Sequence, residues 1–86
     1  MTDDRRQKRK EIGYLQSESV WLQKALFALR KAEDARGKLV DSRDEPPQPY
    51  VLQVAGDEVV VEKLDEALDE RVEALMKTVR EMRRSL

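Results

Sequence analysis

Residues 20–29 read V-W-L-Q-K-A-L-F-A-L, and this segment constrains the fold more than any other part of the chain. With about 100° of rotation per residue, a helix over this segment carries apolar side chains almost all the way round. A helix of this kind is normally surrounded by other structure. The chain has 86 residues, which make one small domain with too little material to surround the helix alone. We therefore expect the missing cover to come from another chain.

The apolar side chains of this predicted helix fall on a core side and two flanks. Leu22, Leu26 and Leu29 share the core side with Leu15 and Ile12, at intervals of three, four or seven residues. The first flank combines aromatic side chains with alanines that permit close approach of another helix, and the second lies nearly opposite. The residues expected at an oligomer or partner interface are Tyr14, Trp21, Ala25, Ala28 and Ala32 on the first flank, and Val20 and Phe27 on the second.

The composition favours a long-helix or coiled-coil protein over a compact mixed globule. Charged residues make up 41% of the chain and aromatic residues only 5%. The chain has no cysteine, so no disulfide supports a small core. It contains no apolar run of about 18 residues and no apolar stretch of signal-peptide type after its first ten residues. We therefore expect a soluble, cytoplasmic protein without a membrane span.

Two helices are predicted. The first runs from about Asp3 to about Arg36, because acidic residues suit its positive end and Gly37 is a natural stop. Its first ten residues are expected to form a basic arm that frays in isolation. The second runs from about Glu62 to the end of the chain, with apolar residues at intervals of three or four along one stripe. That stripe consists of Val61, Leu64, Leu68, Val72, Leu75, Val79, Met82 and Leu86.

The segment between the helices has two parts. Residues 41–49 contain three prolines and form a non-helical connection. Residues 50–61 are rich in β-branched side chains, and Gly56-Asp57 between two apolar runs favours a β-hairpin with a two-residue turn. In the competing interpretation, Asp57 caps the second helix and residues 50–55 form a lone strand. A hairpin alone is marginal in water, so it is expected to pack on the helices or on a second hairpin.

These elements predict a mainly α fold in a single domain over residues 1–86. Its architecture is a long antiparallel helical hairpin with a short β-hairpin or extended segment between the helices. Oligomerisation is expected to complete a helical bundle, either with a second copy as a homodimer or higher species, or with a different subunit. No motif assigns the sequence to a family.

The charges are strongly segregated along the chain. Residues 1–10 have a net charge of +3 and residues 74–86 also +3, whereas residues 41–73 have a net charge of −8. In an antiparallel hairpin the two basic segments meet at one tip, which could contact nucleic acid, an anionic membrane or an acidic partner through counterion release. The same arginines also complement a helix dipole and keep a terminus hydrated. The tip residues are Arg5, Arg6, Lys8, Arg9, Lys10, Arg80, Arg83 and Arg84.

Catalytic and cofactor motifs are absent from the sequence. Carboxylates recur at helical spacing between Glu62 and Glu73, but the chain has no histidine and these acids flank the apolar stripe on its solvent side. Its serines have neither a histidine nor a cysteine beside them for nucleophilic catalysis. We expect no catalytic, cofactor-binding or metal site and no small-molecule substrate. The sequence predicts a non-enzymatic helical interaction module, such as an adaptor, chaperone or assembly factor; the alternative is a nucleic-acid-associated regulator that binds through the basic tip.

Overall fold

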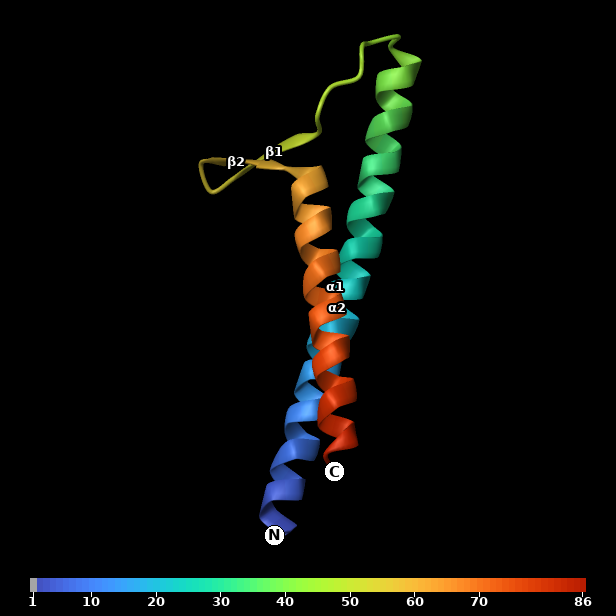
Figure 1. The fold of residues 1–86 in the computed structure, drawn as a ribbon. Coiled ribbons are helices and arrows are strands. Elements are labelled where there is room, and N and C mark those ends of the chain that lie inside the picture. Colours follow the sequence, from blue (N-terminus) through green and yellow to red (C-terminus); the bar gives the residue numbers. More distant parts are fainter. Residues whose placement is uncertain (1) are drawn as a thin grey trace.

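A computed structural model describes residues 2–86, which form two long helices joined by a β-hairpin (Figure 1). The order is α1 (Thr2–Ser42), β1 (Val51–Val54), β2 (Asp57–Val60) and α2 (Val61–Arg84). The molecule is a rod that measures 64 × 25 × 14 Å. Helices account for 76% of the chain, so the predicted mainly α fold is confirmed.

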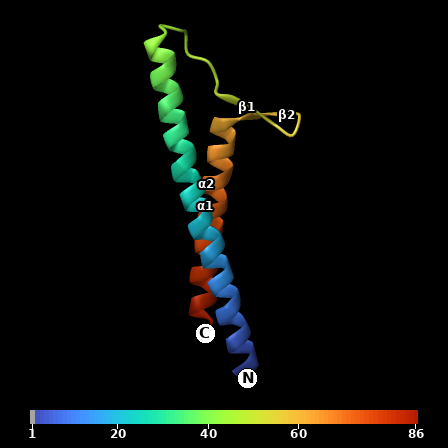
Figure 2. The same cartoon turned by 180° about the vertical axis from the view of Figure 1, so that it is seen from behind.

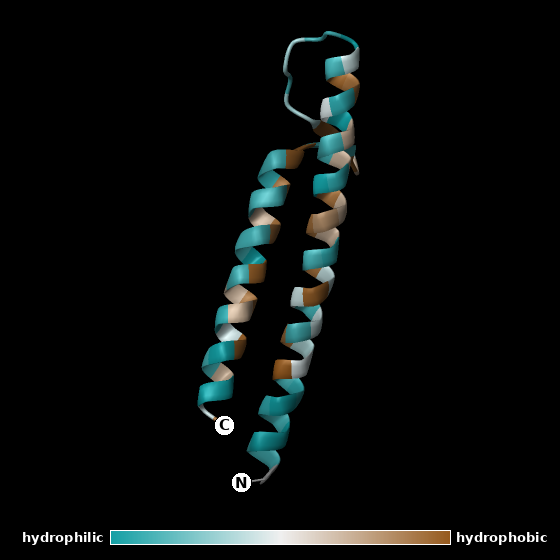
Figure 3. Ribbon diagram, turned by 90° about the vertical axis from the view of Figure 1, so that its right-hand side faces the viewer, coloured by the Kyte–Doolittle hydropathy of each residue, from teal (hydrophilic) through white to brown (hydrophobic). Residues whose placement is uncertain are grey.

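The two helices lie antiparallel, with the apolar segments of each facing the other (Figure 3). Six apolar side chains form the buried core of this contact. The first helix contributes Ile12 and Leu26, and the second contributes Val61, Val72, Leu75 and Val79. Leu15, Leu22, Leu29, Leu68 and Met82 are half-buried beside them. The predicted pairing of the two stripes is therefore confirmed, but Leu64 and Leu86 at the stripe's edges stay partly exposed.

The first helix is longer than the sequence pattern indicates. It passes through Gly37, which is exposed, and ends after Ser42. Asp44 adopts a positive φ of 54°, and the Glu45 amide donates to the Val40 carbonyl at 3.2 Å. The Asp44 amide donates to the Asp41 carbonyl at 3.1 Å, which completes a Schellman termination. The predicted end near Arg36 is wrong because an aspartate takes the left-handed position that was assigned to Gly37.

The non-helical connection is correspondingly shorter at its start. The helix includes Asp41 and Ser42, so the extended segment begins after the turn at 43–44 and runs to residue 50. Pro46, Pro47 and Pro49 lie within it and cannot continue the helix. At the other end of α1, residues 2–10 are helical. Fraying of that basic arm in isolation stays a prediction.

The β-hairpin is confirmed, with its turn one residue earlier than predicted. Val51 pairs with Val60 and Val54 with Asp57, so Asp57 belongs to β2 and does not cap a helix. The two turn residues are Ala55 and Gly56, with φ of 51° and 86°. Two successive positive φ values define a type I′ turn, whose twist matches that of the strands. The interpretation with a lone strand before the second helix is wrong.

The hairpin leads directly into α2 and supplies the start of that helix. Val60, the last strand residue, stands at the N-cap position without a side-chain cap. The Val61 amide instead donates to the Tyr50 carbonyl at 2.9 Å, so the chain entering β1 satisfies the first free amide of α2. The hairpin projects sideways from the rod in both views (Figures 1 and 2), and its second strand contacts α2.

Within residues 2–86, neither helix is long and apolar enough to cross a membrane.

Candidate interaction surfaces

The apolar side chains predicted for an interface lie on the surface of α1. Tyr14 is 73% exposed, and Trp21 and Phe27 are each 64% exposed. One helix can turn only one side toward a single neighbour, so α2 covers the leucine side of α1 and leaves both flanks in water. Their role in an interface stays a prediction.

The first flank carries Tyr14 and Trp21 along α1. The Lys24 ammonium lies 4.4 Å from the centre of the Trp21 ring, a cation–π contact that partly shields the indole. The alanines of this flank are exposed, as predicted for a surface that another helix could approach; they are Ala25, Ala28 and Ala32.

The second flank borders a groove between the helices, here called the interhelical groove. One part of it, about 470 Å³, is lined by Val20 and Gln23 of α1 and Met76 of α2. The next part, about 410 Å³, is lined by Gln23, Phe27 and Met76, so the two parts are continuous. The remaining lining residues are Gln16, Ser19, Leu26, Arg30, Asp69, Val72, Glu73, Val79, Arg80 and Arg83.

Met76 was missed by the sequence analysis. Its side chain is 45% exposed at the point where the two parts of the groove meet. The predicted stripe of α2 runs through Val72, Leu75 and Val79, and Met76 lies one residue outside it. A search for a second apolar or charged row beside the main stripe would have included it.

Ser19 was also misplaced. The apolar spacing of α1 does not include Ser19, but its side chain is buried between the helices. The Gln23 amide donates to the Ser19 hydroxyl at 3.0 Å, so this buried polar atom has a partner. A serine at a core-facing helical position therefore forms part of the floor of the interhelical groove.

Within residues 2–86, two ion pairs join the helices, one on each side of the core. The Arg30 guanidinium donates to both carboxylate oxygens of Asp65, at 3.1 and 3.2 Å. The Asp65 hydrogen bond raises the pKa of Arg30. The Arg71 guanidinium donates to Glu18 at 3.0 Å on the other side. Planar, two-pronged pairing of arginine with a carboxylate fixes geometry as well as adding energy, so the Arg30–Asp65 pair is consistent with one register of the helices.

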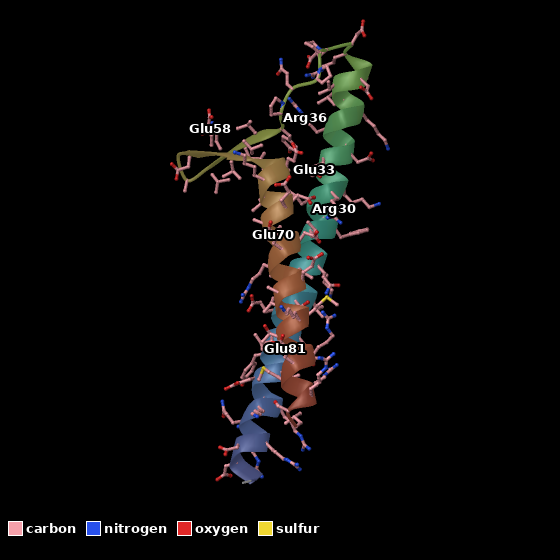
Figure 4. All side chains as sticks on the ribbon, viewed as in Figure 1. Arg30, Glu33, Arg36, Glu58, Glu70 and Glu81 are labelled. Atoms are coloured by element: carbon pink, nitrogen blue, oxygen red, sulfur yellow. The ribbon has the colours of Figure 1, made fainter. Side chains whose placement is uncertain are left out.

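Glu33 is an acidic residue whose ionised form is disfavoured in the folded chain. It is half-buried on α1, beside the beginning of α2 (Figure 4). Burial raises the pKa of Glu33, and the negative charges of Asp65 and Glu62 raise it further, whereas Arg30 opposes this shift. Glu33 also lines a hollow of about 240 Å³ under the connection, where Arg36 lies 5.8 Å from the Tyr50 ring centre.

The basic tip is present at one end of the rod, where both chain termini lie (Figure 1). The Lys8 ammonium donates to the Ser85 hydroxyl at 3.4 Å and so joins the two terminal segments. Six of the basic side chains of the tip line two different hollows. Arg5, Arg6, Arg9 and Lys10 surround one hollow of about 510 Å³, whereas Arg80 and Arg83 line the interhelical groove.

The acidic residues of α2 do not gather around a metal position. Across the described residues, no group of three or more histidine, cysteine, aspartate or glutamate side chains could hold a metal ion. Asp65 is half-buried and paired with Arg30, whereas the other acids of the run are exposed. These are Glu62, Glu66, Asp69, Glu70 and Glu73.

No protein-family model matches the chain, and no curated protein or solved structure is significantly similar to it.

Proposed function

We propose that the protein is a non-enzymatic helical interaction module that acts as an oligomer, in the manner of a small adaptor, chaperone or assembly factor. One observation supports this proposal most directly. Tyr14, Trp21 and Phe27 are large apolar side chains, and all three are mainly exposed on α1. Tyr14 and Trp21 lie on one flank of α1 and Phe27 on the other, and exposed aromatic side chains are enriched in protein–protein contacts.

The narrow shape of the rod adds a second argument. Two helices in contact bury one stripe each, so both flanks of α1 remain available to a third and fourth helix. Pairing of two hairpins into a four-helix bundle would remove one flank from water, at about 25 cal/mol for each Å² of apolar surface buried.

The proposal predicts self-association of the purified chain. Sedimentation equilibrium over a range of micromolar concentrations should show a dimer or higher species. Trp21→Ala and Phe27→Ala, which truncate the two flanks separately, identify the flank that matters, with the exposed-site variant Glu81→Ala as the control. A monomer at every concentration would contradict self-association and leave a different protein as the only partner for these flanks.

A second candidate function is binding of nucleic acid or another polyanion through the basic tip. It is supported by the Lys8–Ser85 contact, which brings the basic terminal segments to the same end of the rod. Titration with heparin and with mixed-sequence DNA at increasing salt concentrations tests it. An affinity that falls steeply with salt would support this function, and no binding at low salt would exclude it.

A further inference from the structure

The rim that α2 contributes to the interhelical groove has an ordered charge sequence. Its exposed residues follow at intervals of four, three, four and three, which keeps them on one side of the helix. In chain order they are Asp69, Glu73, Met76, Arg80 and Arg83, and all five line the groove. We call this row the charge stripe. It is acidic before Met76 and basic after it, and it covers about 21 Å at ~1.5 Å per residue.

The charge stripe is complementary to itself when reversed. If a second stripe lies antiparallel to the first with the two Met76 side chains together, Asp69 faces Arg83 of the second copy. Glu73 then faces Arg80 of the second copy, with an offset of only one residue. A two-fold axis repeats both pairs, which gives four opposite-charge pairs around an apolar centre. An isologous contact between identical chains needs this kind of self-complementarity.

No side chain of the stripe forms an ion pair within residues 2–86, although Asp69 is near enough to Arg30 for its charge to raise the pKa of that guanidinium. In the part of the chain that the structure describes, the inter-residue ion pairs are Arg30–Asp65, Arg71–Glu18 and Lys38–Asp34, none of which uses a stripe residue. Asp69 and Glu73 instead lie four residues apart, where like charges disfavour a helix. A helix dipole explains basic residues in the last turn, but Asp69 lies beyond the first turn of α2, where the dipole has little effect. Opposite charges on a second copy would satisfy all four groups.

The centre of the contact is apolar and accessible. Met76 is 45% exposed and lines the same part of the groove as Val20, which is also exposed. Methionine is flexible and adapts to a surface related by symmetry. The axis through Met76 therefore places apolar groups at the middle of the interface and charged pairs toward its rim, which is the usual arrangement in protein interfaces.

The charge of the whole rod favours the same orientation. The basic terminal segments, each with a net charge of +3, lie at one end, and residues 41–73 carry a net charge of −8. An antiparallel second copy brings its basic end toward the acidic part of the first. A parallel copy would place the two basic ends together, where they repel one another.

From these observations we propose that the interhelical groove binds a second copy of this chain, antiparallel, through the charge stripes and with Met76 at the two-fold axis. This inference rests on the proposed function and specifies its interface. It selects the flank of Val20 and Phe27 for self-association and leaves the flank of Tyr14 and Trp21 exposed.

Charge reversal tests the pairing. Arg80→Glu with Arg83→Glu replaces four attractive pairs with repulsive ones and should raise the dimer dissociation constant by ~10-fold or more. Lys77→Glu with Arg84→Glu is the matched control, because it makes the same change in net charge on α2 outside the groove. Asp69→Lys with Glu73→Lys should weaken the homodimer in the same way.

Mixing the two charge-reversed chains distinguishes a loss of ion pairing between copies from a loss of folding. The Arg80→Glu, Arg83→Glu chain and the Asp69→Lys, Glu73→Lys chain should form a heterodimer when combined, because all four pairs become attractive again. A single chain with all four substitutions should regain the homodimer. Circular dichroism on each variant monitors helix content.

Disulfide cross-linking tests whether Met76 lies at the two-fold axis of the dimer. The chain has no cysteine, so Met76→Cys introduces a single thiol that should form an intermolecular disulfide under mild oxidation. Lys77→Cys on the outer side of α2 should form far less. If the chain dimerises but neither heterodimer rescue nor preferential cross-linking at position 76 occurs, this interface is wrong and the proposed function stands. If the unmodified chain is monomeric throughout, self-association and this interface both fail.

Discussion

At the scale of single residues, the packing of Glu33 in the folded chain disfavours its negative charge. Its position on α1 turns it toward the beginning of α2, where Asp65 and Glu62 also carry negative charge. Arg30 lies close enough to favour the ionised form, but it is already bonded to both oxygens of Asp65. The ionised Glu33 side chain is therefore less favourable in the folded chain than in the unfolded one.

This conflict predicts a pH dependence of stability. Because the pKa of Glu33 is raised on folding, the folded state holds a proton that the unfolded state has already lost as the pH rises above the ordinary value of 4.5. The contribution of Glu33 to stability therefore falls with rising pH across that window and stays reduced at neutral pH. Glu33→Gln should raise the melting temperature by roughly 1–3 °C at neutral pH and change it little near pH 4.

Glu70→Gln is the matched control for Glu33→Gln, because Glu70 is exposed on α2 (Figure 4). Its melting temperature should show no such rise at neutral pH. Thermal unfolding of both variants at the two pH values makes the comparison. A lower melting temperature of Glu33→Gln at neutral pH would show that its charge supports the fold.

Ala55 is the one turn residue whose side chain disagrees with its backbone. Its φ of 51° lies in the left-handed region, where alanine is disfavoured and asparagine is tolerated. Ala55→Asn should therefore stabilise the hairpin by about 0.5–1 kcal/mol. Slower amide exchange at Leu52 and Val59, which form a hydrogen-bonded pair of the ladder, would report this gain. Ala67→Asn in the middle of α2 should have the opposite effect on stability, because asparagine is a poorer helix former than alanine.

At the scale of the elements, the contact between α1 and α2 depends on a few buried side chains. Leu75 is 2% exposed and lies near the middle of the core, whereas Leu64 on the same helix is 37% exposed. Leu75→Ala should reduce the free energy of unfolding by about 2–5 kcal/mol through lost burial and the cavity that remains. A domain of this size has a total stability of about 4–13 kcal/mol, so the loss is a large share.

Leu64→Ala is the control for Leu75→Ala and should cost less than about 1 kcal/mol, because its side chain already contacts water. Urea unfolding at a fixed protein concentration compares the two variants. Equal losses would show that the exposed edge of the stripe is covered in solution. Another chain would then cover Leu64.

At the scale of the whole molecule, the basic arm is expected to serve binding more than folding. Residues 5, 6, 9 and 10 are exposed and basic, and the arm's side-chain contact with the C-terminal segment is the hydrogen bond from Lys8 to Ser85. Exposed like charges cost little in ordinary salt. Removal of residues 1–10 should therefore leave thermal stability unchanged or slightly higher. It should also weaken heparin binding and flatten its dependence on salt.

Collapse of the fold on removal of residues 1–10 would show that the arm is a packed structural element. Unchanged heparin affinity with an intact fold would show that the arm does not bind polyanions. Removal of Arg83 and Arg84 charge by Arg83→Gln with Arg84→Gln provides the comparison from the other terminal segment, since both segments share one end of the rod (Figure 1).

Local patterns in the sequence determined the elements and their order. The spacing of apolar residues identified both helices and their facing stripes, because a side chain's direction on a helix follows from its position in the chain. Gly56 between two apolar runs identified the hairpin. The end of α1 could not be predicted from local patterns, because Asp44 and Gly37 can both adopt the left-handed conformation that stops a helix. The choice between them depends on the turn that follows.

Only the tertiary structure decided which residues share a surface. The relative position of two helices depends on how their side chains interlock, so the sequence alone did not place Met76 beside Val20 or Arg30 against Asp65. It also did not show that Arg80 and Arg83 line the groove with Asp69 and Glu73. The sequence determined the excess of apolar surface on the first helix. The packing angle and register determined that one flank of this surface borders a groove, because those quantities arise from contacts between segments far apart in the chain.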